Sequence, residues 1–279
     1  MQQSPPPPPA PRTDLPEAAQ RRLADLGQRA AGGHLLATTD FSVDELLLAR
    51  AAGFVPLGMV MGSCVYHLGI QYGNWRQNME LQYLSAVMYN ARELAMGRMI
   101  EEASALGADG IIGVQLNIIY HTWSAQSAEF TAIGTAIRHE GGEPWRNDLG
   151  QPFTSDLSGQ AFWKLINAGY KPQGLVLGTC VYHVAHQGFM QQLNQAGQNT
   201  ELSIYTQALY EARELAMSRM QMESERLNAN LVVETKISHS QHLWDAHVME
   251  FFAIGTAARG GADRPAVTPQ LVVSADNYF

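Results

Sequence analysis

Gly58-Met-Val-Met-Gly-Ser-Cys-Val-Tyr-His67 returns later in the chain as Gly174-Leu-Val-Leu-Gly-Thr-Cys-Val-Tyr-His183. Two more segments recur in the same order: ARELAM at 91–96 and 212–217, and AIGTA at 132–136 and 253–257. Self-similarity that keeps its order along the chain indicates two copies of one structural unit. The sequence therefore predicts two tandem domains with the same fold.

The spacing between the copies changes at one place. It is 116 residues from Gly58 to Gly174 and 121 residues from Asn78 to Asn199, so the second copy is five residues longer. The extra residues lie between His183 and Asn199. Because insertions are tolerated in surface loops, we expect this segment to lie outside the packed core.

Composition excludes several classes of protein. The 279 residues are 46% hydrophobic and 16% charged, which is typical of a globular chain. The net charge of -8 argues against nucleic-acid and anionic-membrane partners, because both require a clustered basic surface. No apolar run is long enough for a membrane helix, and the N-terminus does not resemble a secretory signal. Two cysteines are too few for a disulfide framework. We expect a reduced, cytoplasmic protein.

The chain divides into five segments. Residues 1–38 form a proline-rich flexible arm, in which a short helix runs from Asp14 to Arg29. Domain 1 covers 39–140 and domain 2 covers 155–259. Residues 141–154, rich in Gly, Pro and Asn, form the linker, and 260–279 form a flexible tail. A proline-rich arm can dock on a partner protein, although a solvated spacer is the preferred interpretation.

Each copy has the pattern of a β-α-β-β unit. In the first copy, residues 54–67 alternate as a strand, and a long helix follows over 79–106 with Asn78 as its N-cap. Gly58 and Gly62 indicate a bulge or a close backbone approach. The helix stops at Gly107, or at Asn228 in the second copy, since both residue types tolerate a left-handed C-cap. Two strands complete each copy, at 111–120 and 129–137, then 232–241 and 250–258. The fold class is α+β, with one long helix covering each small sheet.

The helix has a buried stripe and charged pairs. Apolar residues recur at helical spacing from Leu84 to Met99 and indicate a core or subunit contact. Arg98 and Glu102 are four residues apart, as are Arg219 and Glu223, and such pairs normally lie on a solvated face.

Several motifs occur together in both copies. In the first copy they are Gly58-x-x-x-Gly62, YNARELA at 89–95, LGAD at 106–109, IIGV at 111–114 and EFTAIGTA at 129–136. In the second copy they are Gly174 and Gly178, YEARELA at 210–216, LNAN at 227–230 and AIGTA at 253–257. Taken together, these motifs resemble the YbjQ-like family, which is labelled heavy-metal-binding. The resemblance implies a dodecin-like fold that closes into ring-shaped homo-oligomers, commonly pentamers. Since this chain has two copies, five chains could form two stacked rings, or the domains could alternate within one ring.

Two Cys-x-x-His steps are candidate metal ligands: Cys64 with His67, and Cys180 with His183. These residue types suit zinc or copper. However, residues three apart on a regular strand point to opposite faces, so one pair cannot chelate without a bulge. We prefer a small buried Cys beside a His at the rim, although a site between chains stays open.

A second group of histidines lies in the last hairpin of the second copy. A four-residue loop would place His242 opposite His247 and, in the same register, His239 opposite Glu250. Two histidines on one face of a hairpin could bind Zn, Ni or Cu. The preferred alternative is exposed hairpin polarity.

The mid-helix polar residues favour assembly over catalysis. Each copy has a Tyr, Arg and Glu at matching positions; these residues are Tyr89, Arg92, Glu93, Tyr210, Arg213 and Glu214. An Arg and a carboxylate can serve acid–base chemistry, but an ion pair between subunits is the interpretation we prefer. No catalytic triad or phosphate-binding loop is recognisable. We expect a non-enzymatic, ring-forming binding or scaffold protein with possible transition-metal binding; the alternative is a ring that holds a flavin-like molecule between subunits.

Overall fold

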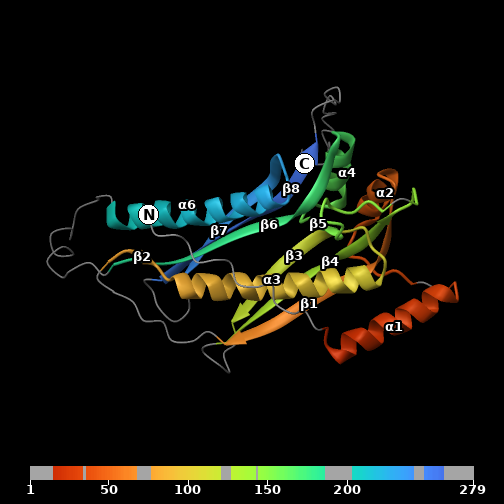
Figure 1. Ribbon diagram of the computed structural model, residues 1–279, viewed down its shortest axis with the longest axis horizontal. Coiled ribbons are helices and arrows are strands. Elements are labelled where there is room, and N and C mark those ends of the chain that lie inside the picture. Colours follow the sequence, from red (N-terminus) through yellow and green to blue (C-terminus); the bar gives the residue numbers. More distant parts are fainter. Residues whose placement is uncertain are drawn as a thin grey trace, which may run out of the picture.

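Two four-stranded sheets, one in each copy, form the framework of the protein (Figure 1). The computed structural model describes residues 15–33, 36–67, 77–120, 127–142, 144–185, 203–241 and 248–260. Domain 1 contains β1 (Phe54–His67), α3 (Gln82–Ala105), β3 (Gly110–Tyr120) and β4 (Ser127–His139). Domain 2 repeats them as β6 (Tyr170–His183), α6 (Ser203–Arg226), β7 (Leu231–Gln241) and β8 (Val248–Gly260). The prediction of two tandem α+β domains is confirmed.

The strand order is the same in both domains. β4 lies between β1 and β3 and is antiparallel to both, and β8 lies in the same way between β6 and β7. The first and second strands of each copy therefore run parallel, with the third strand between them. This order leaves β1 and β6 at the edges of the three-stranded repeats.

A short fourth strand completes each sheet. In domain 1 this strand is β5 (Phe153–Thr154), which comes from the segment between the copies and pairs with β3 in parallel. In domain 2 it is β2 (Met79–Glu80), which belongs to domain 1 in sequence and pairs with β6. The pairing of β2 with β6 therefore joins the two domains by backbone hydrogen bonds and covers the end of the β6 edge at Tyr182 and His183. The corresponding edge of β1 is not paired within the described residues.

Two glycines allow each helix to lie close to its first strand. A Cβ at Gly62 would lie 2.0 Å from the carbonyl oxygen of Ala95, and a Cβ at Gly178 would lie 2.0 Å from that of Ala216. The predicted close backbone approach is confirmed. The predicted left-handed caps are also confirmed, because Gly107 and Asn228 have φ of 72° and 52°.

The N-terminus of the long helix differs from the prediction. The N-cap is Leu81, which makes no side-chain capping hydrogen bond, and Asn78 lies outside the helix. Asn78 instead donates to the carbonyl oxygen of Ile204 and accepts from the backbone N–H of Ala185, both in domain 2. The predicted cap at Asn78 is wrong because this amide is used for a contact between domains.

The N-terminal helix α1 (Glu17–Ala31) begins three residues after the predicted start at Asp14, which lies outside the described residues with the proline run. The tail beyond Gly260 also lies outside them. Two short helices, α2 (Val43–Ala51) and α4 (Gly159–Asn167), pack together at the start of each copy. No helix among the described residues is long and apolar enough to span a membrane.

The two long helices differ in burial although their sequences are alike. α6 buries a single stripe at every fourth position: Ala208, Ala212, Ala216, Met220 and Ser224. α3 buries the equivalent stripe and, in addition, the polar residues Ser85, Arg92 and Glu102. α3 packs on its own sheet and also contacts β6, whereas α6 packs on its own sheet, on β6 and β8 (Figure 1). Of the two long helices, α3 is therefore the one that packs on strands of both domains in the described part of the chain.

Candidate interaction site

A buried ion pair joins the two domains. Arg92 on α3 places Nη2 2.8 Å from Oε1 of Glu250 on β8, and the two side chains are only 2% and 3% exposed. Glu250 also accepts a hydrogen bond of 2.6 Å from Thr179. The Arg92 guanidinium lies 4.2 Å above the ring of Phe252, an arrangement that stabilises a desolvated cation. Since breaking a buried pair leaves an uncompensated charge, this contact favours one fixed arrangement of the domains.

A second contact links the long helices directly. The Tyr89 hydroxyl on α3 donates to Oε1 of Glu223 on α6, and Oε2 of Glu223 accepts a 2.7 Å hydrogen bond from the backbone N–H of Leu177. Burial raises the pKa of the Glu223 carboxyl to about 7. Burial also raises the pKa of Glu93, one turn beyond Tyr89. The interface therefore holds two carboxyl groups that ionise less readily than usual.

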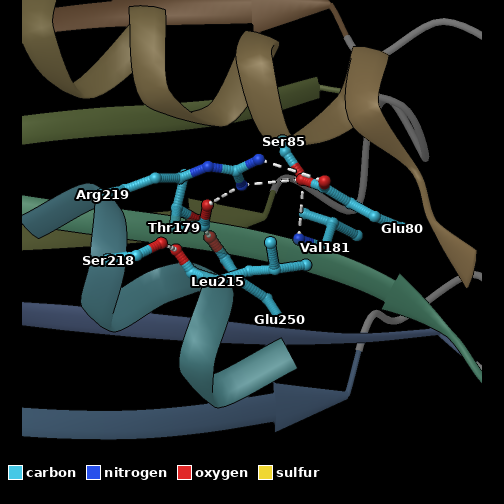
Figure 2. A network of polar contacts seen from close by, with 8 residues as sticks. All are labelled: Glu80, Ser85, Thr179, Val181, Leu215, Ser218, Arg219 and Glu250. Atoms are coloured by element: carbon cyan, nitrogen blue, oxygen red, sulfur yellow. Dashed lines mark hydrogen bonds and ion pairs between the residues drawn. The ribbon is translucent and has the colours of Figure 1, made fainter. Parts of the chain in front are cut away.

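The edge of β6 supplies a third set of contacts (Figure 2). Arg219 on α6 donates from Nη1 and Nη2 to the two carboxylate oxygens of Glu80, at 2.7 and 3.0 Å, and also to the carbonyl oxygen of Thr179. The hydroxyl of Ser85 accepts from the backbone N–H of Val181 at 2.9 Å. The edge of β6 is therefore fixed to α3 by a hydrogen bond from its backbone. α6 is fixed to β2 by an Arg–carboxylate pair with two hydrogen bonds.

The matching residues of the second copy make none of these contacts. Tyr210 is 56% exposed, and the side chains of Arg213 and Glu214 are 42% and 67% exposed. Arg213 pairs with the adjacent Glu214 at 2.6 Å and lies 4.6 Å from the ring centroid of Tyr210. We call these three residues the outer face of α6. One motif thus has two environments: it is buried in domain 1 and open to solvent in domain 2.

Sequence reasoning missed the role of two glutamates. Glu102 and Glu223 were expected on a solvated helix face as partners of Arg98 and Arg219, but Glu102 is buried and Glu223 is half-buried. Each carboxylate accepts the backbone N–H of the edge strand, from Met61 or Leu177. The prediction failed because helical spacing alone does not show that a helix lies within reach of a strand edge. The glutamate occurs at the same position in both repeats, and this repetition was the one sign in the sequence that it has a structural role.

The two Cys-x-x-His steps do not form chelating pairs. In domain 1, Cys64 is buried and donates to the carbonyl oxygen of Ala91, whereas His67 is exposed. In domain 2 both Cys180 and His183 are buried. His183 therefore differs from the expected rim position, because β2 pairs with the end of β6 and covers it. Burial raises the pKa of Cys64 to about 11 and that of Cys180 to about 12, which disfavours the thiolate that binds metals.

The predicted hairpin register is wrong by one residue. His239 pairs with Phe251 and stacks on its ring at 5.7 Å, while Ser240 pairs with Glu250. A shift of one residue moves a side chain to the opposite face of a sheet, so His239 does not face Glu250. His242 and His247 lie outside the described residues. Within the described ranges, no group of three or more His, Cys, Asp or Glu side chains is arranged to hold a metal.

Comparison with known proteins identifies the repeat. A family model described as "Putative heavy-metal-binding" (YbjQ) matches residues 52–140 and again 169–260. The chain is 46% identical over 242 residues to the encapsulin nanocompartment protein of Mycobacterium tuberculosis, a match that covers 86% of this chain and 92% of that protein. This relative therefore shares nearly the whole two-copy chain.

Shorter relatives match a single copy. A UPF0145 protein of Clostridium perfringens is 35% identical over 88 residues, which are 30% of this chain and 81% of that protein. A UPF0145 protein of Halorubrum lacusprofundi is 39% identical over 87 residues, which are 29% of this chain and 82% of that protein. The repeated unit thus corresponds to nearly all of each shorter relative.

Proposed function

We propose, since the chain belongs to the family described as "Putative heavy-metal-binding", that it is a ring-forming oligomeric scaffold that associates with a protein shell. The observation that carries this proposal is the outer face of α6. On α3 the equivalent Arg92 is buried against Glu250 of domain 2, and Tyr89 is half-buried against Glu223. A helix face that contacts another domain in one copy and is exposed in the other is a candidate interaction site.

The direction of the contact between the domains supports a ring. α3 of domain 1 lies against the sheet of domain 2, so the two domains are joined head to tail rather than face to face. A head-to-tail contact leaves one half of the interface unused at each end of the chain, and repetition of the contact produces a closed ring or a filament. In a closed ring, every outer face of α6 is paired with the sheet of a neighbouring chain, so no half of the interface stays exposed.

Association with a shell is supported by the relative from M. tuberculosis. That protein is named as an encapsulin nanocompartment protein and matches this chain over most of both sequences. The proline-rich arm is a candidate docking segment, because extended proline runs present their side chains at low entropic cost. Co-expression with a shell protein of the same organism tests this part of the proposal. Co-sedimentation with intact shells supports it, and free protein at the top of the gradient contradicts it.

Native mass spectrometry of the full chain tests the oligomer. We expect a discrete multimer at micromolar concentration, and Arg213→Glu should lower its population at least tenfold. Glu225→Gln, an exposed change on the same helix outside the outer face, is the matched control. A monomeric wild-type protein would overturn the proposal.

Transition-metal binding is the second candidate function, and the family description favours it. The ligands we propose are the hairpin residues His242 and His247, with Zn, Cu or Ni as the metal. Measurement of bound metal before and after a chelator tests this, with His242→Ala/His247→Ala compared with His139→Ala. Equal metal content in wild type and the double variant would exclude the hairpin.

A further inference from the structure

The sheet of domain 1 has an open face that matches the face covered by α3 in domain 2. On domain 2, Val181, Glu250 and Ser240 pair across the three strands, and Arg92 reaches the central glutamate. The repeat equivalents on domain 1 are Val65, Glu129 and Ile119, which pair across the strands in the same way. Because paired residues of neighbouring strands point to one side of a sheet, these three side chains share a face.

This open face carries exposed apolar side chains among polar ones in the described part of the chain. Met61, Val65 and Ile119 are between 47% and 57% exposed. Met61 and Val65 lie on β1, where buried residues alternate with partly or fully exposed ones from Val60 to Val65, whereas every residue of β6 from Pro172 to His183 is buried. The difference arises because α3 covers β6 and no described helix covers the same side of β1. We call Met61, Val65, Glu129 and Ile119 the receiving face.

A carboxylate beside the receiving face keeps one acceptor available. Oε2 of Glu102 accepts from the backbone N–H of Met61, as Oε2 of Glu223 does from Leu177. Arg22 of α1 binds the same Oε2 at 2.5 Å, and among the described residues no hydrogen bond reaches Oε1 of Glu102. Tyr89 donates to the equivalent atom of Glu223. The Glu102 side chain is only 4% exposed in the single chain, so Arg22 must move before a tyrosine hydroxyl can reach Oε1.

The charged contact at the strand edge is also half complete on domain 1. Arg98 donates to the carbonyl oxygen of Ser63, just as Arg219 donates to that of Thr179. Arg219 has a carboxylate partner in Glu80, whereas Nε of Arg98 is buried without a hydrogen-bond partner among the described residues. Within the described ranges, the edge of β1 therefore has no counterpart of the strand and the carboxylate that β2 gives to β6.

We propose that the receiving face of a second copy of this chain binds the outer face of α6, with Tyr210 on Glu102 and Arg213 on Glu129. The interface repeats, between chains, the contacts that Tyr89 and Arg92 make within one chain. This inference rests on the proposed oligomer and names its contact surfaces. Domains 1 and 2 then alternate around one ring, and every closed ring of whole chains contains an even number of domains.

One substitution makes the interface between chains weaker than the interface within the chain. Phe252, which stacks on Arg92, is replaced by Thr131 at the equivalent position of domain 1. Loss of an aromatic face removes the cation–π contribution to binding of the guanidinium. Subunits should therefore separate on dilution while the two domains of each chain stay together.

A charge exchange tests the pairing by native mass spectrometry of the full chain. We expect Arg213→Glu and Glu129→Arg each to reduce the multimer at least tenfold, and the Arg213→Glu/Glu129→Arg double variant to restore it. Tyr210→Phe, which removes only the hydroxyl aimed at Glu102, should reduce it by a smaller factor. If wild type is a multimer and both single variants remain fully assembled, the receiving face is wrong although the oligomer stands. If wild type is a monomer, the oligomer itself fails.

Cysteine cross-linking gives an independent test that does not depend on stability. A Tyr210→Cys/Val65→Cys variant, which joins the outer face of α6 to an exposed position of the receiving face, should form a ladder of covalently joined chains on a denaturing gel after treatment with a short bis-maleimide. The native thiols are buried and remain outside the reaction. The control Tyr83→Cys/Val65→Cys places one cysteine at an exposed position of α3 outside the outer face of α6. An equal ladder from both variants, or none from the first in an assembled protein, would overturn the pairing.

Discussion

Tyr89 donates a hydrogen bond to Glu223 across the domain interface, while its repeat equivalent Tyr210 is exposed. The two tyrosines occupy the same position on the same kind of helix. Their different environments distinguish a helix face that is covered within the chain from an equivalent face that is open to solvent. The contacts of Tyr89 and its neighbours within the chain predict how the stability of the protein depends on pH and on substitutions.

The carboxyl of Glu223 should make stability depend on pH. Burial raises its pKa from 4.5 to about 7, so the folded chain binds more protons than the unfolded chain between these values. The free energy of unfolding should therefore fall as pH rises through this window, by on the order of 3 kcal/mol. Burial of Glu93 acts in the same direction. Urea unfolding at pH 5 and pH 8 measures the difference.

Glu223→Gln should remove most of this pH dependence, because the amide does not titrate. Glu225→Gln, an exposed change two residues away, is the control and should keep the wild-type slope. An unchanged slope in Glu223→Gln would show that this carboxyl is not responsible.

Arg92→Ala and Arg213→Ala form a matched pair. Arg92→Ala removes one partner of a buried ion pair and leaves Glu250 uncompensated, so the chain should lose about 3–5 kcal/mol of stability. Arg213 is paired at the surface of α6, so its loss should change the stability of the isolated chain by less than about 0.5 kcal/mol. Urea unfolding at high dilution measures both. Equal losses in the two variants would contradict the difference in burial.

The two thiols should be unreactive in the folded protein. Burial raises the pKa of Cys64 to about 11 and of Cys180 to about 12, so at pH 8 fewer than about one molecule in a thousand carries either thiolate. We expect no labelling by a thiol reagent in native conditions and two labels per chain in denaturant, counted by mass spectrometry. Rapid native labelling at Cys64 would instead indicate that α3 separates from β1.

Local patterns predicted most of the fold. The alternation of residues 54–67 gave the bounds of β1 directly, since a strand with one buried face repeats every second residue. The stop at Gly107 and Asn228 followed from their tolerance of positive φ. These features depend on neighbours in sequence, so a single copy of the repeat is enough to recognise them.

The interface could not be predicted in the same way. Tyr89 and Tyr210 lie in almost identical helix segments, and only the path of the chain decides which helix is covered by the second sheet. Asn78 is a good N-cap residue that instead bonds to domain 2. The predicted register of β7 and β8 was wrong by one residue. The register depends on the length of the hairpin loop, and residue types alone do not give that length.

Gly62→Ala and Gly178→Ala should each destabilise the protein strongly. The added Cβ would lie 2.0 Å from a helix carbonyl oxygen, and it would lie 2.6 Å from the backbone nitrogen of Met99 in domain 1 or 2.8 Å from that of Met220 in domain 2. Backbone atoms of a helix cannot move aside alone, so the helix must shift from its strand at a cost of about 3 kcal/mol. Gly27→Ala is the control, because its Cβ meets nothing within 4 Å and alanine favours a helix. Thermal unfolding should show a lower midpoint for the first two variants and an unchanged or higher one for Gly27→Ala. If Gly62→Ala unfolds like wild type, α3 does not lie against β1 as closely as the repeat requires. Equal losses at both positions would show that the two copies use the same contact, even though only one of their helices is also covered by the other domain.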